Sequence, residues 1–437
     1  MLNTIRESIT RIGELSKKKK LKVVSHFDTD GITSAAIFSK ALSRWDKQFS
    51  LQIVKGLDEG FIKGLDEKEV LIFLDLASGS LDYLKNKNTE VFIFDHHELV
   101  QEIPGNVMMI NTVFGSEKLS SAALCYLFAR ELTQENRDLA SLAVLGMVGD
   151  LHEKNVGKLF GEILKDAETT VKKGLLAYPS TRPLDRTLEY SFNPYIPGVS
   201  GSREGVLHLL RDAGIKNENG RYKALYELSD GEMKGLITAV LLKRGTALSE
   251  EEIVGNIFLI KFFNKLEDAR ELSALINSCS RMDRPDVALG FCLGNKHCRQ
   301  EAEKIYINYR QSLSSALKHV SEIDKIEGKD YLIINARDKI KDTIIGTVAS
   351  IMSHSPLYSQ GLVIVALAYN EDKIKVSARV AGREGRNVRE VLHRVVIPLG
   401  GEVGGHPNAA GCLISRNQES EFISELKRVL DVEVVKV

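Results

Sequence analysis

The sequence predicts an α/β fold: a doubly wound, mostly parallel sheet, followed by a smaller C-terminal α/β domain. Within the first 150 residues, short apolar runs rich in Val and Ile alternate with segments of helical periodicity. This alternation is typical of βαβ units, in which helices cover both faces of a parallel sheet. The second domain is predicted because strand patterns return near Tyr331, after a long stretch of helical patterns.

The elements of the first part follow one another in a regular order. An amphipathic helix is expected first, because Leu2, Ile5, Ile9 and Ile12 recur at helical spacing among charged residues. The buried-strand patterns that follow cover residues 21–27, 49–54, 70–76, 91–94 and 107–110. Helices are expected over residues 31–45, 119–132 and 137–148.

The rest of the chain is less regular up to about residue 325. A stretch with four prolines, residues 178–201, is expected to form an ordered loop, and helices are expected over 267–279 and 299–323. Strands are expected over residues 331–334, 362–368 and 373–380. The expected domains are therefore 1–165, a mostly helical central segment and connector at 166–325, and 326–437.

Composition restricts the classes of function. The 59 basic residues balance 59 acidic ones, which excludes a broadly basic nucleic-acid coat protein. Any contact with nucleic acid therefore needs locally concentrated positive charge, or charge supplied by bound metal ions. The five cysteines are scattered without a CxxC pair, which fits a reducing, cytoplasmic compartment. No apolar run reaches the roughly 20 residues that span a bilayer, so no membrane association is expected.

Four short segments place carboxylate or imidazole groups at or just past the end of an apolar run. In the first segment, the side chains alternate at period two and so point the same way on an extended chain. Because the carboxyl ends of the strands form the ligand crevice of an open α/β sheet, these groups are able to meet there. The groups are His26, Asp28 and Asp30, then Asp75, then Asp95, His96 and His97, and finally Asp150.

Taken singly, each of these signals has an ordinary explanation. An Asp after a strand is usually a turn residue or helix N-cap, and a single His is more often a satisfied buried group than a ligand. As a set, two histidines and four carboxylates suit two divalent cations bridged by one carboxylate. The mixture of oxygen and imidazole donors favours Mn²⁺, with Mg²⁺ next. Two such ions about 3.5–4 Å apart activate a water and stabilise both oxygens of a phosphoryl transfer.

A glycine-rich segment, residues 400–411, lies near the C-terminus. Gly404 and Gly405 allow the backbone to approach a phosphate closely, and His406 adds a hydrogen-bond donor. Upstream, Ser377 and Arg379 lie at period two on an expected strand, which makes a reasonable phosphate clamp. A glycine-rich turn between core elements explains the same segment equally well.

The four motifs SHFDTDGITS, LDLASGS, FDHHE and GMVGD, in that order, resemble those of the DHH phosphoesterase family. GGHPNAAG, with SAR upstream, is similar to that family's DHHA1 domain. The His-x-Asp-x-Asp-Gly spacing of the first motif resembles RecJ-like nucleases more than the inorganic pyrophosphatases of the superfamily. The middle segment, DARELSALINSCSRMDRPDVAL, and its size look like those of archaeal RecJ-like proteins.

The resemblance implies a role for each matching residue. Residues 1–165 become the DHH catalytic domain and 326–437 the substrate-binding DHHA1 domain, with a cleft between them. The implied ligands are His26 and Asp28 for one Mn²⁺, Asp30, His96 and Asp150 for the other, and Asp75 as the bridge. His97 is implied to act on the scissile phosphate or in proton transfer, and Asp95 to orient a ligand histidine. Ser377, Arg379, Gly404, Gly405 and His406 are implied to bind a substrate phosphate.

The implied activity is an exonuclease that degrades single-stranded DNA or RNA to mononucleotides. Two alternatives remain open. One is a phosphodiesterase of the same family acting on oligoribonucleotides or cyclic dinucleotides, although the long middle segment favours a polymer or a protein partner. The other is a replicative-helicase accessory protein, since archaeal RecJ-like proteins are similar to a subunit of the eukaryotic helicase and can associate with the GINS complex.

Overall fold

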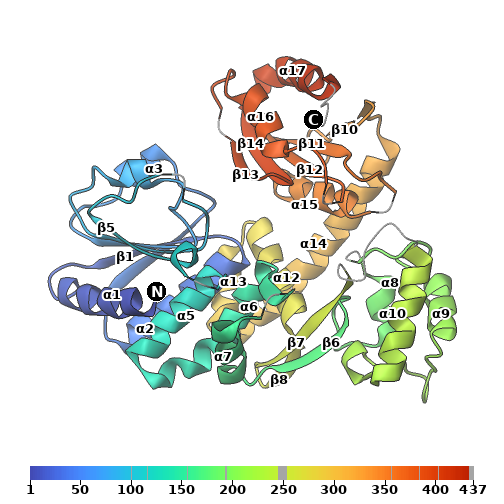
Figure 1. Cartoon of the computed structure of the whole chain (residues 1–437), viewed down its shortest axis with the longest axis horizontal. Coiled ribbons are helices and arrows are strands. Elements are labelled where there is room, and N and C mark those ends of the chain that lie inside the picture. The colour runs from blue at the N-terminus through green and yellow to red at the C-terminus, as the bar shows by residue number, and fades with distance from the viewer. Residues whose placement is uncertain are drawn as a thin grey trace. The chain divides into compact units, whose positions relative to one another are not determined.

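A computed structural model describes residues 1–99, 101–115, 117–154, 156–191, 194–244, 253–355, 357–382, 384–401 and 403–432. The chain forms two compact units, each with its own elements (Figure 1). The first unit consists of Met1–Thr187, Lys216–Ile237 and Glu251–Tyr306, and the second of Leu188–Ile215, Thr238–Glu250 and Ile307–Val437. None of the helices in the described part of the chain is long and apolar enough to cross a membrane.

The first unit is built on a five-stranded sheet in which every neighbouring pair is parallel. Its strands are β1 Leu21–His26, β2 Phe49–Val54, β3 Val70–Leu74, β4 Val91–Asp95 and β5 Val107–Asn111, in the order β2-β1-β3-β4-β5. The predicted doubly wound sheet is therefore confirmed. From β1 the chain adds β2 on one side and then β3, β4 and β5 on the other. The position between β1 and β3 is therefore a topological switch point, where such sheets open a crevice at the carboxyl ends of their strands.

Helices cover both faces of this sheet, as Figure 1 shows for α1, α2 and α5 on one side and α3 on the other. Alternate strand residues point to opposite faces. Val23 packs with α2 (Thr29–Arg44), α5 (Ser121–Leu132) and α1 (Leu2–Leu15), whereas Val24 packs with α3 (Glu59–Lys63) and α4 (Leu81–Leu84). Burial on both faces explains why these strands are continuous apolar runs rather than alternating ones.

A three-stranded antiparallel sheet, which the sequence did not predict, adds to the same unit. It consists of β6 Thr170–Leu175, β7 Val254–Phe262 and β8 Lys265–Asp268. Phe258 and Ile260 of β7 belong to the core that α2 and α5 share. The remaining elements assigned wholly or partly to this unit are η1 Thr112–Phe114, η2 Gln134–Leu139, α6 Ala140–Gly149, η3 His152–Lys154, α7 Lys158–Asp166, α8 Leu184–Glu189, η4 Leu225–Glu227, α10 Asp230–Arg244, α12 Ala269–Arg281, α13 Pro285–Cys292 and the start of α14 Lys296–Glu322.

Several sequence-predicted elements differ in the structure. The helix expected over 137–148 begins only at Ala140, because a 3₁₀ helix occupies the preceding residues. The helix expected over 267–279 begins at Ala269, because Asp268 ends β8 and caps α12 by accepting the backbone N–H of Arg270 at 2.8 Å. The loop expected over 178–201 contains the helix α8.

The C-terminal part of the second unit is a separate domain on a mixed six-stranded sheet, as predicted. Its strands run β13-β14-β12-β11-β10-β9, and only β10 and β11 pair in parallel. They are β9 Ile326–Glu327, β10 Tyr331–Asn335, β11 Val363–Asn370, β12 Lys373–Val380, β13 Val403–His406 and β14 Ala409–Ser415.

Helices pack on both faces of this second sheet. Figure 1 shows α16 (Val388–Val396) and α17 (Glu419–Asp431) on one face and α15 (Asp342–Ser353) on the other. The core on the first face joins Val376 of β12 to Leu392 of α16 and Phe422 of α17. The remaining helices assigned wholly or partly to the second unit are α9 Arg203–Asp212, α14 Lys296–Glu322 and η6 Arg416–Gln418.

Candidate metal centre

The carboxyl edge of the first sheet brings together all six sequence-predicted metal ligands. His26 is the last residue of β1, and Asp28 and Asp30 lie at the N-cap and in the first turn of α2. Asp75 directly follows β3 and His96 directly follows β4, while Asp150 caps the carboxyl end of α6. The strand ends β1 and β3 flank the switch point, so the ligands lie where the topology opens the sheet.

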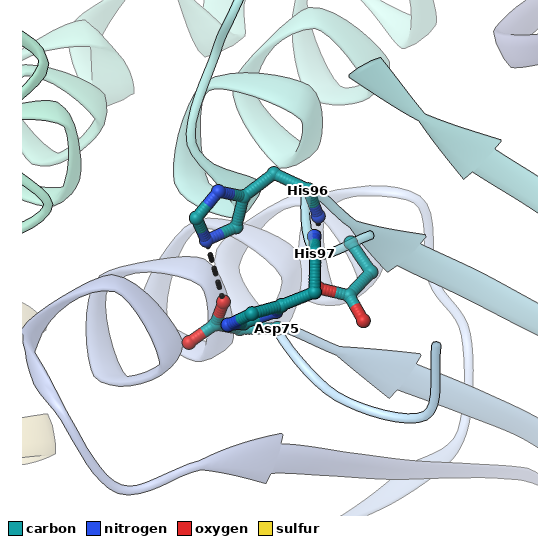
Figure 2. A group of neighbouring side chains, drawn as sticks. Asp75, His96 and His97 are labelled. Carbon is teal, nitrogen blue, oxygen red and sulfur yellow. Dashed lines mark hydrogen bonds and ion pairs between the residues drawn. The ribbon is translucent and has the colours of Figure 1, made fainter. Parts of the chain in front are cut away.

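The six residues form two groups that share one carboxylate. Nδ1 of His26 lies 3.1 Å from Oδ2 of Asp28 and 3.3 Å from Oδ2 of Asp75. Nε2 of His96 lies 3.4 Å from the other oxygen of Asp75, Oδ1, and Figure 2 shows the ring turned toward that carboxylate. Asp75 therefore presents one oxygen to each group.

The second group is completed by two more carboxylates. Nε2 of His96 lies 3.0 Å from Oδ2 of Asp150 and 3.9 Å from Oδ2 of Asp30. One ligand atom from each of Asp30, Asp75, His96 and Asp150 lies within 4.8 Å of the others, and the same holds for His26, Asp28 and Asp75. Ligands on opposite sides of one cation are separated by about 4–4.5 Å, twice a typical bond length, so each group has the dimensions of a metal site.

The backbone holds the two buried carboxylates, Asp75 and Asp30, tightly in place. Asp75 adopts φ 59°, a left-handed conformation that Asp tolerates better than most residues and that turns the chain sharply after β3. Asp30 accepts the backbone N–H groups of Ser121 at 2.7 Å and Ala122 at 2.9 Å, at the amino end of α5. A Cβ on Gly146 would lie 2.5 Å from Oδ1 of Asp30, so glycine is needed where α6 passes this ligand.

Asp95 and His97 form a separate pair at the edge of the centre. Oδ1 of Asp95 lies 2.6 Å from Nδ1 of His97 and accepts the backbone N–H of His96 at 2.8 Å. Oδ2 of Asp95 accepts the backbone N–H of Ser78 at 3.1 Å. The Asp95 side chain is 1% exposed and that of His97 is 46% exposed. Asp95 thus contacts the ring of His97, and it reaches the sequence-predicted ligand His96 only through the backbone.

The electrostatics of the centre call for positive charge. Burial, and then the repulsion of neighbouring carboxylates, raise the pKa of Asp30 and of Asp75 to about 7. Burial also opposes charge on the imidazole of His96, yet its contacts with Asp150 and Asp75 raise its pKa to about 12. Without a cation, the repulsion among the carboxylates is reduced by protons instead, which bind to His96 and to the buried carboxylates.

The donor set fits divalent cations. Nδ1 of His26 and Oδ2 of Asp150 are buried without a hydrogen-bond partner among the described residues, although both face other ligand groups. Bound cations would satisfy both atoms. Carboxylate oxygens with a few imidazole nitrogens, and no thiolate, are donors that favour Mn²⁺ or Mg²⁺ over structural Zn²⁺.

Mn²⁺ is expected to raise the thermal midpoint of unfolding more at about pH 8 than at about pH 5.5. In the metal-free folded chain, Asp30 and Asp75 keep their protons up to about pH 7, whereas their ordinary value is 3.8. The unfolded chain therefore binds fewer protons than the folded one between these values, and the stability of the metal-free protein falls as pH rises through them. Mn²⁺ needs deprotonated ligands, so the stabilisation it gives grows over the same range.

The measurement is differential scanning fluorimetry of the chelator-treated chain with and without MnCl₂. The Asp75→Asn variant is the control and should lose most of the Mn²⁺ effect at the higher pH. An equal rise at both pH values in the unmodified chain would contradict the assignment of these carboxylates as ligands.

The sequence analysis did not identify His152, which also lies at this centre. Its ring centroid is 5.8 Å from that of His96, and ligand atoms of His96, Asp150 and His152 lie within 4.8 Å of one another. Burial, and then the charge of His96, lower the pKa of His152 to about 4, so the metal-free protein holds this imidazole neutral. The only sequence signal was its place two residues after Asp150.

The predicted substrate-binding residues lie in the C-terminal domain. Ser377 and Arg379 lie on β12, while Gly404, Gly405 and His406 lie on β13. The strand between them, β14, pairs its Ala409 with Arg379 on one side and with His406 on the other. Arg379 and His406 thus lie at the same level of the sheet, two strands apart. The backbones of strands so placed are about 9–10 Å apart. Nε of Arg379 donates to Oγ of Ser350 on α15 at 2.9 Å.

Three family models match separate stretches of the chain. The DHH family N-terminal domain matches residues 20–147, the DHH-CID domain residues 179–253 and the DHHA1 domain residues 328–431. An uncharacterised protein of Methanocaldococcus jannaschii is 27% identical over 430 residues, covering 94% of this chain and 93% of that protein. The single-stranded-DNA-specific exonuclease RecJ of Bacillus subtilis is 23% identical and covers 98% of this chain, which spans only 48% of that relative.

Solved structures share the fold at low sequence identity. RecJ of Thermus thermophilus in complex with Mn²⁺ gives a TM-score of 0.63 at 16% identity, over 98% of this chain and 55% of that one. An exonuclease RecJ bound to manganese gives 0.62 at 16% identity, over 98% and 95%. CDC45 of Entamoeba histolytica gives 0.68 at 11% identity, over 99% of both chains.

Proposed function

Because the chain belongs to the RecJ-like DHH/DHHA1 family, we propose that it is a metal-dependent exonuclease that hydrolyses single-stranded DNA or RNA to mononucleotides. One observation carries the proposal: the buried carboxylate of Asp75 presents one oxygen to each of two ligand groups. A carboxylate so placed suits a pair of cations held side by side, the arrangement used for phosphoryl transfer to water. The family's phosphoesterase chemistry and the intact ligand set support the same assignment.

The ligands divide between two positions. We assign His26, Asp28 and one oxygen of Asp75 to the first, and Asp30, His96, Asp150 and the other oxygen of Asp75 to the second. We propose Mn²⁺ as the ion, with Mg²⁺ next, as the donor set favours. When bound, two such cations supply an acidified water and offset the charge on the attacking and leaving oxygens.

His97 is proposed to act on the scissile phosphate. The contact between its Nδ1 and Asp95 fixes the ring and keeps Nε2 for the substrate. That hydrogen bond, against the effect of burial, raises the pKa of His97, which favours the protonated imidazole, the form able to donate a proton. The His97 side chain is 46% exposed, more than that of any of the six assigned ligands, the most exposed of which is Asp28 at 34%, and this fits a group that meets substrate.

Arg379→Ala is expected to raise KM for a single-stranded oligonucleotide about tenfold and to change kcat by less than about threefold. In the proposed role, Arg379 binds a substrate phosphate equally in the ground state and the transition state, with Ser377, Gly404, Gly405 and His406. Steady-state kinetics measure both constants. Arg389→Ala, which removes an exposed arginine of the same domain, should leave both unchanged. A loss confined to kcat in the Arg379 variant would exclude a clamp role.

Substrate length distinguishes the exonuclease from a small-substrate phosphodiesterase of the same family. An exonuclease should show a higher kcat/KM on an oligonucleotide of about twenty nucleotides than on a dinucleotide, because a longer strand contacts more of a binding groove. A higher kcat/KM on the dinucleotide or on a cyclic dinucleotide would instead indicate the small-substrate phosphodiesterase. Wild-type protein with Mn²⁺ is sufficient for this comparison.

A role in replication is a second proposal, supported by the likeness to CDC45 over the whole chain. In this role the chain binds a replication protein, with GINS as the expected partner, and the nuclease centre is retained. Size-exclusion chromatography of the full chain mixed with purified GINS tests it. Co-elution is expected, and separate elution at micromolar concentration would exclude a stable complex.

A further inference from the structure

We propose that His152 is an additional ligand of the second cation and that it gives the centre its preference for Mn²⁺ over Mg²⁺. This inference rests on the proposed metal centre and names a residue outside its six expected ligands. Its basis is geometric: His96 and Asp150 belong both to the group with Asp30 and Asp75 and to a group with His152. A cation held by the two shared residues is therefore within reach of a further imidazole nitrogen.

The turn after α6 is built to bring His152 back to the centre. The helix ends at Gly149, and Asp150 caps it. Leu151 then adopts φ 58°, a left-handed conformation that is unfavourable for a branched side chain. Its own side chain gains little from this turn, because Leu151 is 68% exposed. The consequence of the strained turn is that the next residue, His152, faces His96 edge-on, with an angle of 74° between the rings.

A buried ion pair holds the turn in place from the other side. Glu153, the residue after His152, is 1% exposed and pairs with Arg270 of α12. The backbone carbonyl of Glu153 also accepts a hydrogen bond from the side chain of Asn256 on β7 at 3.2 Å. Elements more than a hundred residues away in sequence thus fix the 3₁₀ helix that carries His152. Such anchoring is expected of a group that must stay at ligand distance.

The chemistry of the additional donor determines the selectivity. Mg²⁺ is a hard ion that keeps its waters and binds through one or two carboxylates. Imidazole nitrogen suits transition-metal ions better, and affinity for such donors rises from Mn²⁺ along the first row. With His152 the second position has two imidazoles and up to three carboxylates, and without it only one imidazole. His152 should therefore strengthen the binding of Mn²⁺ and leave that of Mg²⁺ nearly unchanged.

Isothermal titration calorimetry of the full-length, chelator-treated chain with MnCl₂ and with MgCl₂ tests the inference. His152→Asn is expected to lower the Mn²⁺ affinity of one position at least about tenfold, and the Mg²⁺ affinity less than about twofold. His297→Asn, the same change at an exposed histidine, is the matched control and should alter neither. If the Asn variant does not fold, as judged by circular dichroism, His152→Gln takes its place.

Three outcomes would overturn the inference. Equal weakening of both ions would mean that His152 supports the centre without binding the cation. Unchanged Mn²⁺ binding would mean that it has no part in metal binding. Absence of Mn²⁺ binding in the unmodified chain would refute the proposed metal centre as well as the role of His152. Selective loss of Mn²⁺ affinity, in a chain that cleaves no nucleic acid, would instead uphold the ligand and refute the nuclease.

Discussion

Asp75→Asn is expected to lower kcat for single-strand hydrolysis by at least about a thousandfold, with the fold retained. The reason is that Asp75 is the only ligand shared by both groups, through Oδ2 toward His26 and Oδ1 toward His96. An amide has one carbonyl oxygen and no charge, so both positions lose affinity at once. Neighbouring carboxylates also repel each other less after the change, which should keep the metal-free protein stable.

Asn is a better test than Ala at this position. The backbone of residue 75 lies at φ 59°, a left-handed conformation that Asn adopts readily. Ala in this conformation would destabilise the folded state by roughly 1–2 kcal/mol. Asn also retains an oxygen able to accept the hydroxyl of Ser121, which lies 3.1 Å from Asp75. Asp82→Asn, at an exposed carboxylate on α4, is the matched control and should behave as wild type. Full activity in the Asp75 variant would refute the shared-ligand assignment.

His97→Asn is expected to lower kcat by about a hundredfold to ten-thousandfold while Mn²⁺ affinity changes only a few-fold. His97 is proposed to donate a proton to the substrate rather than to hold a cation, and its Nδ1 is already engaged by Asp95. His97→Asn is therefore expected to remove the proton donor while the metal ions stay bound. Asp75→Asn, in contrast, is expected to weaken the binding of the metal ions. Steady-state kinetics and calorimetry with MnCl₂ on the same preparation separate the two effects. Loss of Mn²⁺ binding would reassign His97 as a ligand.

The core strands could be predicted because their signal is local. β2 and β12 have the predicted bounds, since both are marked by apolar residues between clear turn or charged residues. The candidate ligands could be located because each lies at the carboxyl end of such a strand or apolar helix, or within four residues of it. By contrast, the pairing of β6 with β7 joins residues that are far apart in sequence, such as Thr170 with Leu259 and Leu175 with Val254, and no local pattern encodes it.

His152 was beyond sequence reasoning for a different physical reason. Its approach to His96 depends on the left-handed backbone of Leu151, a conformation that sequence patterns assign to Gly, Asn or Asp. It also depends on the pairing of Glu153 with Arg270, which are 117 positions apart. Asp95 is close to both histidines in sequence, so no sequence pattern shows which ring it contacts. The conformation of the turn after β4 brings the ring of His97 to it.

We propose that this carboxylate and imidazole cluster hydrolyses single-stranded nucleic acid. The most direct test follows the degradation of 5′-labelled and 3′-labelled single-stranded DNA and RNA of one sequence, with Mn²⁺ and with chelator. We expect stepwise shortening from one end with release of mononucleotides, only when the metal is present. Failure to cleave any strand with Mn²⁺, or unchanged cleavage in the presence of chelator, would refute the proposed activity.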